Sequence, residues 1–155
     1  MRDCIERTNW SELCRFASER NRDMPCRPLS DMTNGLHNVV RLLEFDDNTR
    51  WVARIQMARS TKTSARKLQS EVDVMMLLRE RAGIPVPRVF GYEVDDHNQA
   101  QVAFLLMEFL PGNVAVDADG GYEIHQGHIP PKHREGFYNA VARIHVPFAV
   151  STLFF

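Results

Sequence analysis

The sequence predicts an α+β protein with a mostly antiparallel sheet of about five strands and one packed helix. Residues 29–57 are rich in β-forming residues and are interrupted by two turns, which is the pattern of a hairpin. Residues 62–81 then repeat apolar side chains at helical spacing, and further strand-like segments follow. Strands on both sides of a single long helix favour a sheet with that helix packed on it.

Length and composition indicate a globular protein. The chain has 155 residues, 44% of them apolar and 25% charged, which is enough to bury a core. A net charge of −1 gives no electrostatic reason to expect nucleic acid or a membrane as partner. The charged N-terminus is unlike a signal peptide. Cys4, Cys14 and Cys26 are too few and too irregular for a disulfide framework, so we expect a reduced, cytoplasmic protein.

Residues 1–28 are expected to form a helical extension that precedes the sheet. A helix over residues 9–22 is predicted by a capping pair, Asn9 and Glu12, and by apolar side chains at helical spacing. Those apolar side chains, which would share one face, are Trp10, Leu13, Cys14 and Ala17. Pro25 ends the extension, because proline does not continue a helix.

The sheet is predicted to start with strands on either side of tight turns. Residues 32–38 are turn-like around Gly35. Strands over residues 39–45 and 51–57 are separated by a second turn at residues 46–48. Strand, turn and strand at this spacing predict an antiparallel hairpin.

The helix over residues 62–81 is the clearest element of the sequence. Its apolar side chains recur at helical spacing with charged residues between them, and Gly83 and Pro85 end it. The residues of this stripe are Leu68, Val72, Met75, Met76 and Leu78. We expect both methionines to lie in the core.

Two more strands and a final helix complete the predicted fold. Residues 88–94 and 101–109 are strand-like, and a Pro-Gly break closes the second of them. Residues 113–131 are predicted to be a loop, and residues 132–145 a helix that Pro147 stops. The helix would place Phe137, Val141 and Ile144 on one side.

Arg54 and Glu71 are the first candidates for chemistry. Arg54 would lie within a strand, on the same face as Val52 and Gln56. Glu71 lies beside the apolar stripe of the long helix. A cation near a buried sheet needs an anionic partner, and a paired guanidinium is well suited to hold a phosphate. Two unrelated charges on a solvated surface are the alternative that spacing alone leaves open.

Two backbone segments are weaker candidates. Gly35 would let the amide groups of its turn approach an anion, although a plain hairpin turn explains the same glycine. Leu105–Gly112 leaves a buried strand and enters a Pro-Gly break, so its backbone could meet a planar ligand. A strand that simply ends explains that segment equally well.

Three histidines between residues 125 and 133 could be metal ligands or ordinary exposed side chains. His125 and His128 have the spacing of two zinc ligands, with His133 as a third. No cysteine lies near them, so exposed loop histidines are the preferred interpretation and no metal site is predicted. The acidic residues around position 119 lack the spacing of a calcium-binding loop.

The order of these segments resembles the N-terminal lobe of the aminoglycoside phosphotransferase and choline-kinase-like family, which has a protein-kinase-like fold. Gly83–Val89 resembles the proline-containing link after that family's glutamate helix, and Leu106–Gly112 resembles its hinge, the most specific match. Ala140–His145 resembles the helix that follows the hinge. The resemblance covers residues 30–146 and implies that residues 29–112 form a kinase-like N-lobe with its hinge.

The resemblance implies a phosphate site. Gly35 and Asn38 would lie in the loop over the phosphates. Arg54 would take the place of the basic residue that contacts them, and Glu71 would be its ion-pair partner. The sequence departs from the family in two respects, since the loop has a single glycine and arginine replaces the lysine more common in kinases.

The resemblance also implies an adenine site. Glu108 and Leu110 would offer backbone hydrogen bonds to the base, and Val52 would line its pocket. The implied cofactor is ATP with Mg²⁺, with weak or absent binding expected in so short a chain.

The catalytic residues of the family are expected to be absent. The family places a catalytic Asp in a His-Gly-Asp-type loop, with an Asn soon after it and a metal-binding Asp beyond. The ten residues after His145 are mostly apolar and contain no such motif. We therefore expect a truncated phosphotransferase-like protein, inactive alone, with a linker loop and the start of a truncated C-lobe over residues 113–155. Full-length relatives would transfer the ATP γ-phosphoryl group to a small-molecule hydroxyl.

Two non-enzymatic alternatives stay open. One is a binding or regulatory module that docks a protein partner on the surface meant for the C-lobe. The other is a gene remnant without function. A nucleotide and a protein are the partners that the sequence leaves in view.

Overall fold

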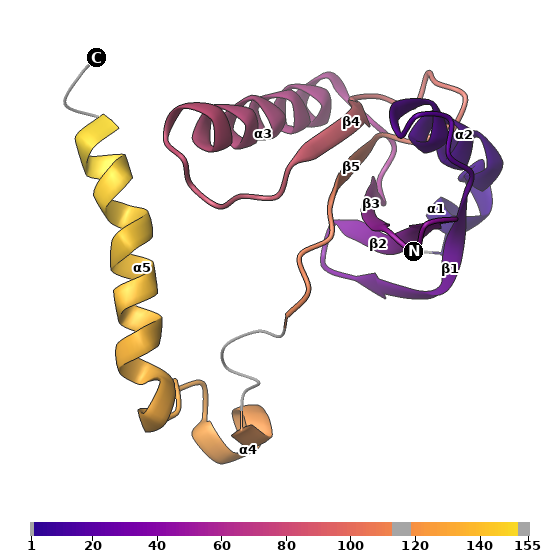
Figure 1. Ribbon diagram of the computed structural model, residues 1–155. Coiled ribbons are helices and arrows are strands. Elements are labelled where there is room, and N and C mark those ends of the chain that lie inside the picture. The colour runs from indigo at the N-terminus through magenta and orange to yellow at the C-terminus, as the bar shows by residue number, and fades with distance from the viewer. Residues whose placement is uncertain (1, 113–118, 152–155) are drawn as a thin grey trace. The chain divides into compact units, whose positions relative to one another are not determined.

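The computed structural model describes residues 2–112 and 119–151, with side chains of the last helix described as far as Val146 (Figure 1). These residues divide into two compact units. The first takes residues up to Leu77 together with Val86–Phe109, and the second takes Leu78–Pro85 and the residues from Leu110 on. None of the helices in the described ranges is long and apolar enough to cross a membrane.

A five-stranded antiparallel sheet forms the centre of the first unit, which confirms the predicted α+β fold. The strands are β1 (Cys26–Asn34), β2 (Asn38–Phe45), β3 (Arg50–Gln56), β4 (Val89–Glu93) and β5 (Phe104–Glu108). Their order across the sheet is β1-β2-β3-β5-β4, and every neighbouring pair is antiparallel. The last two strands therefore add to the hairpin of β2 and β3 on one side only.

The turn between β2 and β3 is the one that the sequence predicts, whereas the turn before β2 is shorter. The amide of Phe45 donates to the carbonyl of Thr49 at 2.9 Å, and Asn48 adopts a positive φ of 64°. Residues 32–34 pair with β2 instead of turning, so only residues 35–37 separate β1 from β2. Cross-strand hydrogen bonding there outweighs the local turn preference.

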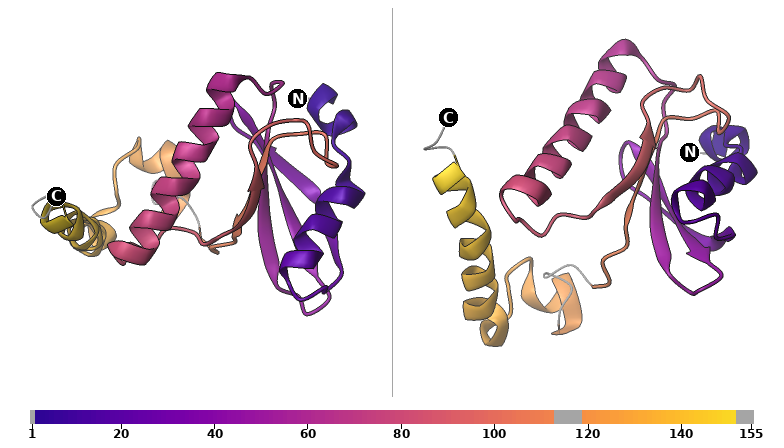
Figure 2. Two further views of the ribbon diagram at one scale, coloured as in Figure 1. Left: turned by 90° about the horizontal axis from the view of Figure 1, so that it is seen from above. Right: turned by 45° about the horizontal axis from the view of Figure 1, so that its top comes forward.

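Two N-terminal helices cover one face of the sheet, on the side opposite the long helix (Figure 2). They are α1 (Arg2–Arg7), which the sequence did not predict, and α2 (Trp10–Arg20). The side chain of Asn9 accepts a hydrogen bond from the amide of Glu12, which confirms the predicted N-cap. Leu13 and Ala17 are fully buried against the sheet.

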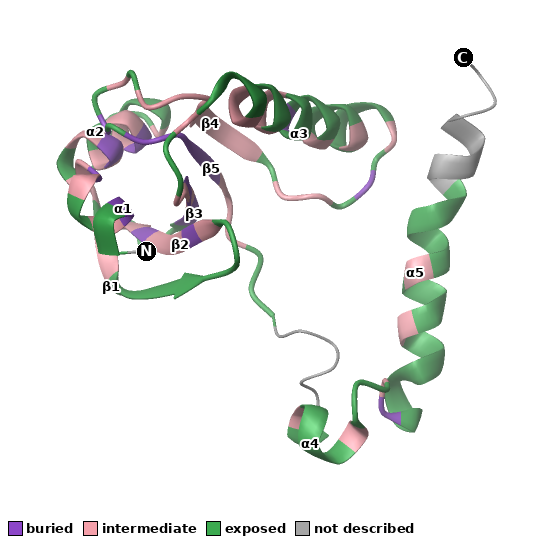
Figure 3. Ribbon diagram, turned by 180° about the vertical axis from the view of Figure 1, so that it is seen from behind, coloured by how far each residue is buried: buried purple, intermediate pink, exposed green. Residues whose placement is uncertain are grey.

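The core lies between these helices and the strands, where the buried residues concentrate (Figure 3). The strand residues on this α1–α2 face, all buried, are Val39, Leu43, Phe45, Trp51, Ala53, Ile55, Phe104 and Leu106. The rings of Trp51 and Phe90 stack with centroids 3.9 Å apart, and Phe16 meets Phe104 edge-on at 5.0 Å.

Gly91 on β4 lets α2 approach the sheet. A Cβ at this position would meet the side chains of Phe16 and Arg20 at 2.7 Å. The close contact is possible only because glycine has no side chain.

The helix α3 (Lys62–Arg81) lies over the opposite face, called here the α3 face, and has the predicted bounds (Figures 1 and 2). Val72 is fully buried, but the expectation that Met76 lies in the core is wrong, because 43% of it is exposed. Gln69 and Glu71 make polar contacts between α3 and the sheet, and Met76 lies more than a turn beyond Glu71 along the helix.

The second unit contains α4 (Gly121–His125) and α5 (Pro131–Ser151). The helix α4 corrects the prediction of a continuous loop, although residues 113–118 of that loop lie outside the described residues. Five residues are too few to show a helical period. The helix α5 also continues past Pro147, which was expected to end it. A proline inside a helix removes its own amide hydrogen bond and crowds the carbonyl four residues earlier, which can kink a helix without ending it.

Candidate functional site

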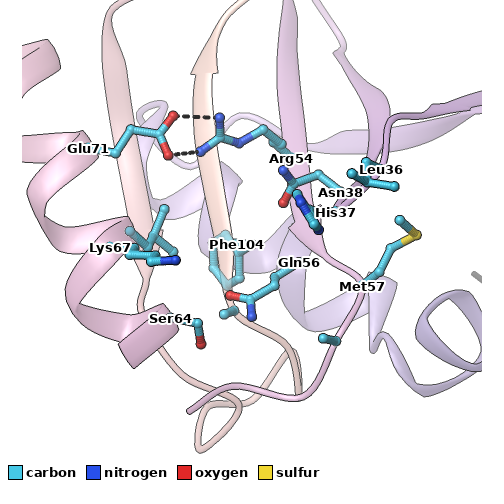
Figure 4. Close-up of a pocket in the computed structure, with 13 residues that line it drawn as sticks. Leu36, His37, Asn38, Arg54, Gln56, Met57, Ser64, Lys67, Glu71 and Phe104 are labelled. Carbon is cyan, nitrogen blue, oxygen red and sulfur yellow. Dashed lines mark hydrogen bonds and ion pairs between the residues drawn. The ribbon is translucent and has the colours of Figure 1, made fainter. Parts of the chain in front are cut away.

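The side chains of Arg54 and Glu71 form a two-pronged ion pair (Figure 4). Nη1 of Arg54 donates to Oε1 of Glu71 and Nη2 donates to Oε2, each at 2.6 Å. Arg54 comes from the middle of β3 and Glu71 from the facing side of α3. The side chains are 21% and 43% exposed, so the pair sits at the edge of the α3 face rather than in the core. The geometry fixes the plane of the guanidinium.

A cavity of about 420 Å³ opens beside this pair, within the first unit (Figure 4). The helix α3 forms one wall, the connection between β1 and β2 forms another, and the end of β3 forms the floor. Its lining residues are Leu36, His37, Asn38, Arg54, Gln56, Met57, Ala58, Ser64, Lys67, Leu68, Glu71, Ala103 and Phe104. The cavity therefore joins segments that are far apart in the sequence.

The charges of the lining favour an anion. Arg54 and Lys67 are cationic, Glu71 is the single carboxylate, and both of its oxygens already accept from Arg54. Lys67 makes no ion pair with any residue that the structure describes. Asn38 and Gln56 add neutral hydrogen-bonding groups, so a phosphate entering the cavity would meet both charge and donors.

The structure gathers three of the residues predicted for the phosphate site, Asn38, Arg54 and Glu71, in this cavity. Gly35 directly precedes the lining residues Leu36–Asn38, and its amide donates to the carbonyl of Asn38 at 3.0 Å. The φ of Gly35 is not positive, and a Cβ there would meet no atom within 4 Å. The local geometry therefore does not require a glycine at this position.

The residues predicted for the adenine site are not part of the cavity lining. Val52 is buried on the α3 face, two residues before Arg54. Glu108 ends β5, where its amide donates to the carbonyl of Arg88 at 2.8 Å and its carboxylate accepts from the amide of Arg88 at 3.0 Å. Leu110 belongs to the second unit and is 52% exposed.

Sequence reasoning missed the remaining wall of the cavity. Ser64 and Lys67 precede Glu71 by seven and four residues, so the three side chains share one face of α3, and this spacing could have identified them. His37 offers no comparable signal, because its place in the wall depends on how the β1–β2 connection folds.

The histidines of the second unit have other contacts. Nε2 of His125 lies 3.0 Å from the carbonyl of Asp119, and Nε2 of His133 lies 2.8 Å from its carboxylate. The hydrogen bond from Lys132 lowers the pKa of Asp119, with a smaller contribution from His133. In the described part of the chain, no three His, Cys, Asp or Glu side chains are placed to hold a metal ion.

Comparison with known proteins places the site in a family context. Residues 29–146 match the model of the phosphotransferase enzyme family. The chain is 31% identical over 108 residues to altered inheritance of mitochondria protein 9, mitochondrial, of Candida dubliniensis, a match covering 69% of this chain and 17% of the relative. It is 28% identical over 138 residues to probable acyl-CoA dehydrogenase IBR3 of Arabidopsis thaliana, covering 84% of this chain and 16% of that protein.

The chain thus spans about a sixth of the length of these curated relatives. No solved structure shows a significant match to it.

Proposed function

Because the chain belongs to the phosphotransferase enzyme family, we propose that the α3 face of its sheet binds the phosphates of ATP. The observation that carries this proposal is the Arg54–Glu71 pair, with two contacts of 2.6 Å, at the wall of a cavity that also presents Lys67. An arginine side chain has five N–H donors, and Glu71 takes two of them. The others can donate to phosphate oxygens while Glu71 holds the guanidinium in place.

The lining fits phosphate groups better than it fits Mg²⁺. Its single carboxylate, on Glu71, accepts from Arg54 through both oxygens, whereas Mg²⁺ requires oxygen ligands. Mg²⁺ would therefore arrive with the nucleotide and keep phosphate oxygens and water as ligands.

We further propose that these 155 residues position the nucleotide but do not transfer its phosphoryl group on their own. Transfer to a small-molecule hydroxyl needs a group that orients or deprotonates the acceptor, and the sequence contains no His-x-Asp followed closely by Asn. In an active phosphotransferase that includes this segment, other residues would supply that group.

Thermal unfolding with and without Mg-ATP tests the phosphate site. A ligand at a hundred times its Kd stabilises the folded state by about 2.7 kcal/mol, which raises the Tm. Arg54→Ala should abolish the rise. Arg50→Ala is the matched control, because Arg50 lies on the same strand, pairs with Glu44 at 2.7 Å and does not line the cavity.

Two results would contradict the proposal. One is no rise in the Tm of the wild-type protein with Mg-ATP, and the other is a rise in Arg54→Ala equal to that of the wild type. Adenosine serves as a ligand control, since a site built for phosphates should respond to it far less.

A non-catalytic module that binds a protein is the second candidate. It is favoured by exposed apolar side chains on α3, where Val74, Met76 and Leu77 are 50%, 43% and 51% exposed. Cooperative melting that does not respond to Mg-ATP, together with a stable dimer or complex in light scattering, would support this candidate instead.

A further inference from the structure

We propose that Arg7, at the end of α1, is a positioning residue for the cavity; its effect on ligand binding rests on the proposed function above. The Arg7 side chain is only 8% exposed. The two hydrogens of its Nη2 are shared among the carbonyl oxygens of Gln56, Met57 and Ala58, at N···O distances of 3.3, 3.0 and 3.3 Å. A single guanidinium from the N-terminal extension thus holds three consecutive backbone groups.

The residues that carry these three carbonyls form the floor of the cavity. Gln56, Met57 and Ala58 all line it, and β3 ends at Gln56. Where a strand ends, the sheet no longer supplies every hydrogen bond, so the part-buried carbonyls of Gln56 and Met57 need another partner. A charged donor is a stronger partner than a neutral one, and Arg7 supplies it from the α1–α2 face of the sheet.

The same segment also anchors the opposite wall. The amide of Met57 donates to the carbonyl of His37 at 2.9 Å. His37 lies in the connection between β1 and β2, which lines the cavity opposite α3. Arg7, the segment 56–58 and this connection therefore form a continuous hydrogen-bonded chain.

The other contacts of Arg7 do not offer a simpler explanation for its burial. Nη1 donates to Asp3 at 2.9 Å, but the Asp3 side chain is 82% exposed and such a pair contributes little. Nε of Arg7 is buried and has no hydrogen-bond partner among the described residues. Burying a cation costs free energy, and the hydrogen bonds to the three carbonyls offset this cost for the Arg7 guanidinium. Arg7 also lies outside residues 29–146, so the family match does not account for it.

Hydrogen exchange of the ligand-free protein tests the positioning role directly. Arg7→Met keeps the apolar stem and removes every donor. Amides of residues 35–38 and 56–60 should exchange faster in this variant, whereas those of β4 and β5 should not change. Leu13→Ala is the control for general destabilisation, since Leu13 is fully buried on α2 and touches neither segment by a hydrogen bond. Unchanged exchange of both segments in Arg7→Met would overturn the inference.

Calorimetric titration with Mg-ATP then tests the consequence for binding. We expect Arg7→Met to weaken binding about tenfold, which corresponds to about 1.4 kcal/mol of binding free energy. Arg7→Lys keeps a charged donor and should stay within about threefold of the wild type. Leu13→Ala should bind as the wild type does, although it melts earlier.

The outcomes separate this inference from the proposed function. The role of Arg7 is overturned if Arg7→Met binds Mg-ATP as tightly as the wild type does, or if Leu13→Ala loses as much Mg-ATP affinity as Arg7→Met. This holds even if Arg54→Ala no longer binds Mg-ATP. A wild-type protein that does not bind Mg-ATP overturns the proposed function, and the exchange experiment alone then decides whether Arg7 positions the cavity floor.

Discussion

The two faces of the central sheet are built from the same strands and differ in what they present. The α1–α2 face carries the buried apolar and aromatic side chains of the core. The α3 face carries Arg54 and Gln56 and the cavity beside them. Because side chains alternate along a strand, neighbours in the sequence serve different faces. The comparison teaches that the fold assigns most stabilising residues and most residues of the candidate site to different faces, and Phe104 belongs to both sets.

Leu43 and Leu42 provide the largest test of this separation, because they are adjacent on β2 and face opposite sides. Leu43 is fully buried on the α1–α2 face, whereas Leu42 is half-buried on the α3 face. Leu43→Ala should lower the free energy of unfolding by about 2–5 kcal/mol, and Leu42→Ala by less than half as much. Urea denaturation measures both. Equal losses would mean that the two faces contribute alike to stability.

Gly91 tests how tightly the α1–α2 face is packed. Gly91→Ala places a methyl group 2.7 Å from both Arg20 Nε and Phe16 Cε1, so we expect a loss of about 1–3 kcal/mol in the free energy of unfolding. Adding Arg20→Ala should recover part of that loss, because it removes two of the three nearest atoms. If Gly91→Ala alone is as stable as the wild type, α2 can move away from β4 at little cost in free energy.

Glu71 should give the opposite result on the α3 face. Its side chain is 43% exposed, so Glu71→Ala should change the free energy of unfolding by less than about 1 kcal/mol. It should nevertheless reduce the rise in Tm with Mg-ATP, because Arg54 loses the partner that orients it. A large loss of stability with unchanged nucleotide response would contradict the assignment of this face to binding.

Glu44 gives the smallest expected effect, and it depends on pH. Hydrogen bonds from Arg27 and then Arg50 hold the pKa of the Glu44 carboxyl below its ordinary value of 4.5. Because the pKa is lower in the folded state, these ion pairs stabilise the protein fully at pH values above the ordinary pKa of 4.5. The stabilisation is lost as the pH falls through the folded-state pKa. Glu44→Gln should therefore lower the Tm at about pH 7 and approach the wild-type Tm at about pH 3. A difference in Tm between the two proteins that does not change with pH would contradict the ion pairs of Glu44 as its cause.

The sequence predicted the elements whose side chains repeat with a clear period. The bounds of α3 and the pairing of β2 with β3 follow from such repeats and from the turn between them. The juxtaposition of Arg54 and Glu71 was one of two open interpretations, and the structure brings the two side chains together. Periodicity indicates which face of its strand or helix each residue lies on. For Arg54 and Glu71, those two faces were enough to suggest the pair.

What the sequence could not predict depends on contacts between distant segments. The six residues of α1 are too few for a stable isolated helix, and they are helical because Cys4 is buried against the sheet. Arg7 reaches carbonyls some fifty residues away, which no local pattern indicates. Met76 fits the apolar stripe of α3 and is exposed, because spacing does not say where the underlying sheet ends.

The irregular pairing of β1 has a consequence for how the protein meets other copies of itself. This strand forms one edge of the sheet, and its register with β2 shifts between Pro28 and Met32. Pro28 has no amide hydrogen to donate, and the carbonyl of Leu29 is taken by Nε of Arg41 from β2. An incoming strand would therefore find an interrupted row of backbone groups, so β1 is a poor template for strand addition and aggregation.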